Sequence, residues 1–371
     1  MSASILMVPI TSWVIGRAFI KSLSCTREMP SRAYEGASTT VKITLRGYLS
    51  LLSTAEVTDE TPTWVKVSPY TECFEEETNA FVVTYTLTPL KRGICKIGPI
   101  KVTVTDPLGL FRLSTKQQVF AELVVLPRPL PIPDSRLWYI GKLGNHQFEG
   151  IGRKGRSGTE FHGIREYQPG DELRRIHWRS TARHGELRVI EFEHSRAPDI
   201  VIAIDLQSNA EADIGFYTPL DYGAKFAAYL AEQVLALGGS ARLLLPRSVY
   251  LRLKSDATPT NLHSILDILA RLGSDESESL SEVLIENSKS ISQASSVVCL
   301  SHLVGPTLVK CVRMLQQEGV KLQFIIMVID GILDSNTDEL IRELMSEKVG
   351  VSVIECSSHK IFCRLRARNN V

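Results

Sequence analysis

The sequence predicts a multidomain α+β chain in which an antiparallel β-sandwich is followed by a doubly wound, Rossmann-like α/β domain. Residues 34–126 carry short segments of alternating polar and apolar residues with no helical pattern between them, which is typical of a sandwich. From residue 197 onward, short apolar runs alternate with segments of helical periodicity, which indicates a mostly parallel sheet with helices on both faces. The length of 371 residues suits two or three domains.

The predicted sandwich occupies residues 34–127. Strands are expected at 39–45, 81–87, 100–105 and 119–126, with turns at 35–36, 91–93 and 106–109. Residues 128–196 are predicted to hold a connector and a distinctive central stretch. The connector begins in Pro127–Pro133, which we expect to be extended because each proline fixes φ and disfavours a preceding helix. The glycine-rich, basic stretch 141–158 is interpreted as a surface loop, with phosphate binding as an alternative that lacks a GxxxxGK[ST] motif.

The predicted α/β domain occupies residues 197–371. Strands are expected at 200–204, 241–245, 297–300, 322–329 and 351–354, and helices at 220–237, 262–272, 306–319 and 338–348. The segment 249–253 is predicted to be the hairpin partner of 241–245, and the polar segment 274–296 to be a loop that contains a short helix.

Residues 1–33 form a predicted apolar N-terminal segment. Ile5 to Ile20 is largely apolar but contains Pro9, Gly16 and Arg17. Because a spanning helix needs about 20 apolar residues, this stretch alone does not span a membrane. Three interpretations stay open: an interfacial helix, the remnant of a membrane anchor, or a packed terminal segment.

The overall charge and the cysteines exclude several classes of function. The net charge is +1, so no overall field favours nucleic acid as a partner. The seven cysteines form neither a CxxC pair nor a cluster with zinc spacing, and they suit reduced thiols in a cytosolic-facing protein. Cys356 and Cys363 lie near the last predicted strand, where a disulfide between them is the less favoured alternative.

Three stretches resemble one family. The first holds Lys91-Arg92-Gly93, Gly98-Pro99 and the run from Asp106 to Phe111. The second holds Gly158-Thr159-Glu160-Phe161, Arg165-Glu166-Tyr167, Pro169-Gly170-Asp171, Arg174-Arg175-Ile176-His177-Trp178 and Ala182-Arg183, and we call it the central signature. The third is Ile204-Asp205, at the end of the first α/β strand. Together they are similar to the DUF58 family of bacterial and archaeal proteins, whose biochemical function is unassigned.

The resemblance implies a β-sandwich followed by a von Willebrand factor A-like α/β domain. It also implies a partner to test, because relatives are commonly encoded beside MoxR-type AAA+ ATPases. Family members usually begin with two membrane helices, whereas here only Ser12-Trp13-Val14-Ile15 with Arg17 resembles the end of the second. The expected location is the cytoplasmic side of the membrane, or the cytoplasm if residues 5–20 do not anchor the chain.

The resemblance also suggests a metal site. A von Willebrand factor A domain binds Mg²⁺ through Asp-x-Ser-x-Ser after its first strand, and this chain has Asp205, Gln207 and Asn209 at those positions. The two amides offer oxygen ligands but are longer than serine and neutral, and the later strand runs into Ser301-His302 where an aspartate would be expected. We therefore predict a degenerate site, in which either Mg²⁺ binds or Asp205 caps a turn.

The central signature allows three interpretations. It is rich enough in acids, arginines and histidines for acid–base chemistry, but no spacing singles out a mechanism, so no catalytic residues are predicted. Nucleic-acid binding is disfavoured because acidic residues interleave with the arginines. The favoured interpretation is a structural clasp between the two domains, with arginines forked onto carboxylates and a tryptophan packed beneath. Its expected members are Arg165, Glu166, Tyr167, Gly170, Asp171, Arg174, His177 and Trp178.

These observations favour a non-enzymatic protein-interaction scaffold or adaptor that works with a MoxR-type ATPase. The alternative is a metal-dependent enzyme, or a magnesium-dependent adhesion-type module, that uses Asp205 and the central signature. No cofactor other than a possible Mg²⁺ is expected.

Overall fold

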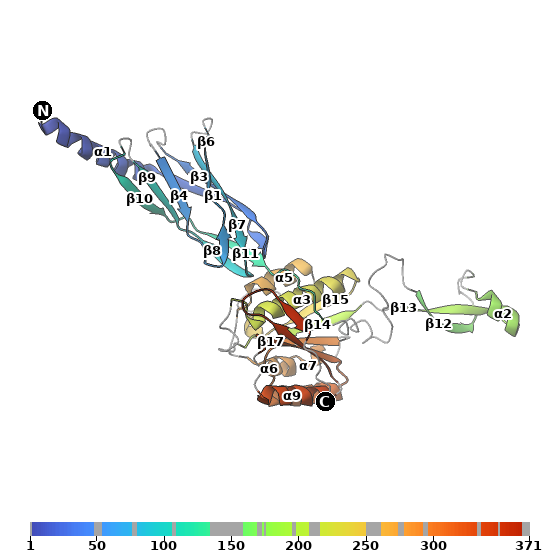
Figure 1. Cartoon of the computed structure of the whole chain (residues 1–371). Coiled ribbons are helices and arrows are strands. Elements are labelled where there is room, and N and C mark those ends of the chain that lie inside the picture. The colour runs from blue at the N-terminus through green and yellow to red at the C-terminus, as the bar shows by residue number, and fades with distance from the viewer. Residues whose placement is uncertain are drawn as a thin grey trace.

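The computed structural model describes residues 2–47, 54–75, 80–105, 109–133, 159–168, 173, 176–194, 198–207, 216–249, 261–273, 278–291, 296–331, 335–347 and 349–365. Figure 1 shows three parts that follow an N-terminal helix. They are a β region (residues 24–126), a hairpin (residues 159–194) and an α/β region (residues 199–365). The mixed α+β class is the one that the sequence predicts.

The β region consists of three sheets that share one apolar core. One sheet has the order β1-β3-β7-β5 with β6 also paired to β7, the second is β10-β9-β4, and the third is β2-β11-β8. Alternate residues of β3, such as Val41, Ile43 and Leu45, are fully buried in this core. The strands are β1 (Ser24–Glu28), β2 (Arg32–Tyr34), β3 (Thr39–Arg46), β4 (Thr54–Asp59), β5 (Val65–Val67), β6 (Thr71–Glu75), β7 (Ala80–Pro89), β8 (Gly93–Ile97), β9 (Ile100–Thr105), β10 (Arg112–Gln117) and β11 (Ala121–Leu126).

The N-terminal segment is a helix that leads directly into the β region. Helix α1 (Ser2–Ser22) ends beside the core of the β region, where Ile20 packs and Leu23 is buried. No helix in the described part of the chain is long and apolar enough to cross a membrane. The β region begins with β1 at Ser24, rather than at residue 34 as predicted, because β1 pairs with β3. The short polar strands β1 and β2 lack the alternation that would have revealed them in the sequence.

The sheet of the α/β region has the order β15-β14-β16-β17-β18-β19 among the described residues. Strands β14 to β18 pair in parallel, and β19 runs antiparallel to β18 at the edge. The strands are β14 (Asp199–Ile204), β15 (Ser240–Leu244), β16 (Ser296–Ser301), β17 (Leu322–Ile329), β18 (Gly350–Cys356) and β19 (Cys363–Leu365). Because β15 and β16 lie on opposite sides of β14, the direction of strand order reverses between β14 and β16.

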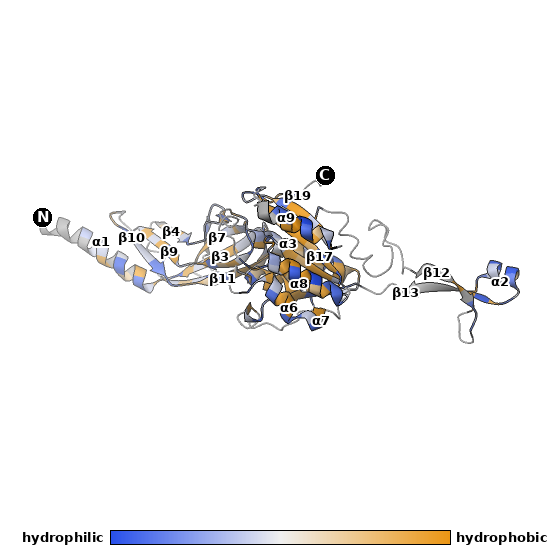
Figure 2. Ribbon diagram, turned by 90° about the horizontal axis from the view of Figure 1, so that it is seen from below, coloured by the Kyte–Doolittle hydropathy of each residue, from blue (hydrophilic) through white to orange (hydrophobic). Residues whose placement is uncertain are grey.

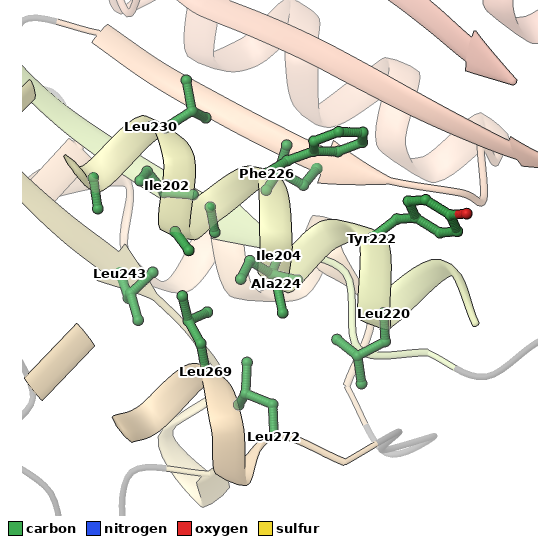
Figure 3. Close-up of a cluster of buried hydrophobic side chains, with 14 of the residues drawn as sticks. Ile202, Ile204, Leu220, Tyr222, Ala224, Phe226, Leu230, Leu243, Leu269 and Leu272 are labelled. Carbon is green, nitrogen blue, oxygen red and sulfur yellow. The ribbon is translucent and has the colours of Figure 1, made fainter. Parts of the chain in front are cut away.

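Helices cover both faces of this sheet, as the alternation of strands and helices predicts. Ile202 and Ile204 of β14 pack with α3 (Pro219–Ala236) and α5 (Leu262–Arg271), as Figure 3 shows. Val201 and Ala203 point to the other face, which packs with α6 (Leu280–Glu286), α8 (Pro306–Gln317) and α9 (Ser335–Ser346). Figure 2 shows β17, between the layers, as almost continuously hydrophobic. Such a pattern is typical of a strand buried on both faces.

Two details of the α/β region differ from the prediction. A further strand, β19, follows the strand that was expected to be the last. The sequence does not predict it, because Cys363–Leu365 is too short to show a periodic pattern. Of the expected hairpin partner 249–253, the structure describes only Val249, which lies in a helical turn at residues 247–249. The short helix expected in segment 274–296 is α6, and it is followed by α7 (Ser288–Ile291).

Candidate functional site

The candidate site lies at the carboxyl edge of the α/β sheet, where the strand order reverses. Asp205 follows β14, and Ser301 ends β16, the parallel neighbour of β14. Asp205 is 4% exposed, and its backbone N–H donates to the carbonyl of Leu300 at 2.9 Å. Open α/β sheets bind ligands in the crevice at such a reversal, so the position of Asp205 is one where a functional side chain is expected.

Both carboxyl oxygens of Asp205 are in contact with neighbouring groups. Ser301 Oγ lies 2.6 Å from Oδ2, and the backbone N–H of Gln207 donates to Oδ1 at 3.2 Å. Ser301 Oγ also lies 2.7 Å from the carbonyl oxygen of Leu303 and accepts from the Leu303 N–H at 3.1 Å. A hydroxyl group carries a single proton, so Ser301 donates either to Asp205 or to Leu303, not to both.

A protonated Asp205 satisfies every atom of this group. Its carboxyl O–H then donates to Ser301 Oγ, and the Ser301 hydroxyl donates to the carbonyl of Leu303. Burial is the largest influence on the pKa of Asp205 and raises it, while the charge of His302 and the hydrogen bond from Ser301 act in the opposite direction. Since a Mg²⁺ site needs an ionised carboxylate, the upward shift of the Asp205 pKa by burial opposes a Mg²⁺ site.

The predicted metal ligands do not assemble within the described residues. That part of the chain contains no group of three or more His, Cys, Asp or Glu side chains able to hold a metal ion. Gln207 reaches Asp205 through its backbone N–H, and Asn209 lies outside the described residues. Asp330, after β17, is engaged elsewhere: Ser358 donates to its Oδ1 at 3.1 Å, and hydrogen bonds from Ser358 lower its pKa. The described residues therefore do not form a Mg²⁺ site on their own, and the set of Asp205, Gln207 and Asn209 stays a prediction.

The described part of the central signature lies on the hairpin. Its strands β12 (Thr159–Glu166) and β13 (Arg188–His194) pair antiparallel, with Arg165 opposite Val189 and Glu166 opposite Arg188. The N–H of Tyr167 donates to the carbonyl of Leu187 at 2.9 Å and extends this pairing. The hairpin also contains helix α2 (Trp178–His184).

The residues around α2 have local roles. His177 caps α2, since its Nδ1 accepts from the N–H of Ser180 at 3.1 Å. Trp178 is 67% exposed, so the prediction that it packs beneath a lattice of ion pairs is wrong for this structure. Gly170, Asp171 and Arg174 lie outside the described residues, and the structure does not place them.

A buried group of charges lies where the β region meets the α/β region. We call it the junction cluster; its members are Glu35, Lys91 and Arg92 from the β region and Asp221 and Lys225 from α3. Lys225 Nζ lies 2.6 Å from Glu35 Oε1, and both side chains are 2% exposed. Arg92 Nε lies 3.1 Å from Asp221 Oδ1, and Lys91 Nζ lies 2.8 Å from Asp221 Oδ2.

Further contacts fix the junction cluster in place. Arg92 Nη1 donates to the carbonyls of Leu269 at 2.7 Å and Leu272 at 2.9 Å, at the C-terminal end of α5. Guanidinium donors suit this position because helix C-termini expose carbonyls with partial negative charge. The Tyr217 hydroxyl donates to the carbonyl of Leu90 at 3.0 Å, and Lys225 Nζ lies 4.5 Å from the Tyr217 ring centroid. The two regions are thereby held by directional bonds as well as by apolar packing.

Each charged side chain of the junction cluster shifts the pKa of its neighbours. Burial opposes ionisation of Asp221, but the charges of Arg92 and Lys91 prevail and lower its pKa. Burial raises the pKa of Glu35 and lowers that of Lys225, and each of the two charges partly offsets the effect on the other. Since an unpaired buried charge is costly, removal of one partner destabilises the rest of the cluster.

A comparison with known protein families finds a match, which includes most of the hairpin and the candidate site at the edge of the α/β sheet. Residues 163–333 match the family model described as "Protein of unknown function DUF58". The DUF58 match includes α2, Asp205 and Ser301, and it supports the resemblance that the sequence motifs indicate. No curated protein matches the chain. A match to a solved structure, "IgNAR antibody domain C3", covers 26% of this chain and 96% of the antibody-domain chain. The sequence identity is 12% and the TM-score is 0.14. A TM-score this low carries no argument about fold or function.

The expected clasp between the two regions is not made by the described residues of the central signature. In Figures 1 and 2 the hairpin lies on the opposite side of the α/β region from the β region. Ionic contacts between the regions are made instead by the junction cluster and by Arg32 with Asp267. For Gly170, Asp171 and Arg174, which are outside the described residues, the clasp stays a prediction.

The sequence offered one signal for the junction cluster. Lys91-Arg92-Gly93 belongs to the first stretch that resembles the DUF58 family, although it was interpreted only as a turn. Its partners Asp221 and Lys225 lie in a helix that follows much later in the chain, and no local pattern connects the two segments. Asp221 also forms a capping box with Thr218, which is a sufficient local reason for an acid at that position.

Proposed function

We propose that the chain is a non-enzymatic protein-interaction scaffold and that its hairpin is the element that binds the partner. The observation that carries this proposal is the exposure of three large apolar side chains there: Leu173 is 68%, Trp178 is 67% and Leu187 is 44% exposed. A two-stranded hairpin alone is marginally stable in water. Packing against a partner would cover the apolar side chains and stabilise the hairpin.

The chemistry of α2 favours an acidic protein surface as the partner. Arg179 and Arg183 are both exposed and lie four residues apart on one side of the helix. Tryptophan and arginine are the residues that most often dominate the binding energy of protein interfaces. By the DUF58 resemblance, we propose a MoxR-type AAA+ ATPase as this partner, at the cytoplasmic side of a membrane.

We infer a finer fold assignment from the sheets. The α/β region is proposed to be von Willebrand factor A-like, because a central parallel strand, β14, is followed directly by an aspartate, Asp205, at the point where the strand order reverses. The β region is proposed to be a β-sandwich, because its sheets enclose one shared core. Domains of both kinds commonly act in protein recognition rather than in catalysis.

Binding between the purified chain and a MoxR-type ATPase tests the proposal. Trp178→Ala is expected to raise the Kd about 30-fold, since a central interface tryptophan contributes about 2 kcal/mol or more. Phe120→Ala is the matched control, because Phe120 is 62% exposed but lies in the β region. It should leave the Kd unchanged. Circular dichroism checks that both variants fold.

Two outcomes would contradict the proposal. Equal loss of affinity in both variants would mean that the hairpin is not the binding element. An absence of measurable binding by the wild-type chain would exclude the proposed partner.

A magnesium-dependent module built on Asp205 is the second candidate. The position of Asp205 at the reversal of strand order supports it, while the hydrogen bonds of its carboxyl group oppose it. Calorimetric titration of Mg²⁺ and Mn²⁺ into the wild type and Asp205→Ala separates the two candidates. Binding that is lost in the variant would favour the module, and an activity assay would then distinguish an enzyme from an adhesion-type domain.

A further inference from the structure

Two cysteines lie directly opposite each other at the edge of the α/β sheet. In the antiparallel pair β18–β19, the register places Cys356 opposite Cys363. The next pair toward the turn is hydrogen-bonded, since the N–H of Ser357 donates to the carbonyl of Phe362 at 3.2 Å. Hydrogen-bonded and non-hydrogen-bonded pairs alternate along an antiparallel ladder, so the cysteines occupy a non-hydrogen-bonded pair.

This position brings the two thiols close together. In non-hydrogen-bonded pairs the Cα atoms are about 4.5 Å apart and the side chains are closest, which lies within the range that a disulfide requires. Cys356 is 3% exposed and belongs to the apolar core beneath α3, and Cys363 packs against the same core. Both side chains therefore lie on one face of the sheet, and both are free thiols in this structure.

The turn between the cysteines is held in place by α3. The Tyr222 hydroxyl accepts from the N–H of Phe362 at 3.2 Å and lies 2.9 Å from the carbonyl of Ser357. The same hydroxyl also lies 2.9 Å from the carbonyl of Lys360. Tyr222 thus bridges the two sides of the turn and keeps Cys356 and Cys363 in register while both are reduced.

We propose that Cys356 and Cys363 are a redox modification site that forms a reversible disulfide by exchange with a low-molecular-weight disulfide. The thiolate of Cys363, the more accessible of the two, attacks the reagent disulfide; a mixed disulfide forms and one reagent thiolate leaves. The thiolate of Cys356 then attacks the Sγ of Cys363 and displaces the second reagent thiolate. The two cysteines together lose two protons and two electrons, and the reagent disulfide is reduced to two thiols.

The disulfide would change how the edge of the sheet is held. In the reduced state, β19 is held to β18 by the pairing of their strands, which runs from the pair Ile354–Leu365 to the pair Cys356–Cys363. A covalent link at the last of these pairs would prevent β19 from separating from β18. Burial raises the pKa of both thiols, so the exchange should be slow at neutral pH and faster at higher pH.

Peptide mapping of the full chain tests the proposal. The reduced chain is incubated with glutathione disulfide at alkaline pH without oxygen, the remaining thiols are alkylated, and the chain is digested with trypsin. Because Lys360 lies between the cysteines, cleavage there leaves two peptides joined only by the disulfide. The expected product is the linked pair, and dithiothreitol should return both cysteines to the alkylated form.

Three variants make the result specific. Cys363→Ser should abolish the linked peptides and leave Cys356 alkylated, because Cys356 is too buried to react alone. Cys356→Ser should stop the reaction at a glutathione adduct on Cys363. Cys73→Ser should leave the link intact, since Cys73 is exposed and far from this pair in the sequence.

The proposal is overturned if Cys356 and Cys363 of the wild type are both recovered in the alkylated form, and so have formed no disulfide, although Cys73 has fully reacted with glutathione disulfide. Detection of the link only after addition of urea would also overturn it, because the pairing would then belong to the unfolded chain. Circular dichroism before and after the exchange establishes which state reacted.

Discussion

At the scale of single residues, the hydrogen bond between Asp205 and Ser301 makes the protonation of Asp205 the property to test at the sheet edge. Asparagine is close in shape to a protonated aspartic acid. In Asp205→Asn, the amide N–H can donate to Ser301 Oγ, and the amide oxygen can still accept from the N–H of Gln207. The substituted side chain would thus keep all the hydrogen bonds of the neutral acid at every pH.

We therefore expect Asp205→Asn to raise the free energy of unfolding by about 1 kcal/mol at pH 7. The pKa of Asp205 is raised in the folded state, so its stabilising contribution is complete below the unfolded pKa, about 3.9, and is lost as pH rises through the folded value. The advantage of asparagine should hence shrink as pH falls. Urea unfolding across this pH range measures it.

Asp205→Ala is the control for this measurement. It removes the partner of Ser301 and of the Gln207 N–H and should cost about 1–3 kcal/mol at low pH, where Asp205 contributes fully, and less as pH rises through the folded pKa. If the asparagine variant is less stable than the wild type at pH 7, Asp205 is ionised in the folded protein, and the case for a cation site becomes stronger.

At the scale of elements, the turn between β8 and β9 depends on a glycine. Gly98 has φ of +108°, and a Cβ atom there would overlap the carbonyl oxygen of Val119. Gly36 also has a positive φ, +74°, but a Cβ atom there would meet nothing within 4 Å. Gly98→Ala should lower the free energy of unfolding by about 3 kcal/mol or more, and Gly36→Ala by about 1 kcal/mol. Chemical denaturation measures both, and equal effects would show that the contact with Val119 can relax.

The sequence predicted elements well where a regular pattern extends over several residues. The run Leu322–Ile329 was assigned correctly because seven of its eight residues are apolar, which indicates a strand buried on both faces. The sequence did not predict β19 and β1, because each is short. Each is held in the extended conformation by pairing with a neighbouring strand, and that pairing leaves no local sequence pattern. The exposure of Trp178 was also missed, since a large aromatic residue in a charged stretch is more often buried.

At the scale of the whole molecule, the junction cluster is what makes one body from two regions. Lys225 and Glu35 are 190 residues apart in sequence, and their contact exists only once both regions have folded. Sequence periodicity reports local burial and cannot pair such residues. This is why the fold class was predictable and the mode of attachment between the regions was not.

Lys225→Ala should destabilise the chain by about 3–5 kcal/mol, because it leaves the buried carboxyl group of Glu35 without the lysine that it contacts. The double variant Lys225→Met with Glu35→Gln should recover most of that loss. Lys116→Ala is the matched control, since Lys116 and its partner Glu60 are 56% and 50% exposed and such surface pairs contribute about 0–1 kcal/mol. Scanning calorimetry measures all three, and a small effect of Lys225→Ala would show that water reaches the cluster.

The junction cluster also has a consequence for rotation in solution. Two regions joined by a flexible linker tumble partly independently, whereas regions fixed by directional buried contacts reorient together. Figure 1 shows α1 at the end of the β region remote from the α/β region. A fluorophore on α1 should therefore report the slow rotational correlation time of the combined β and α/β regions, and rupture of the junction should shorten it to that of the β region alone.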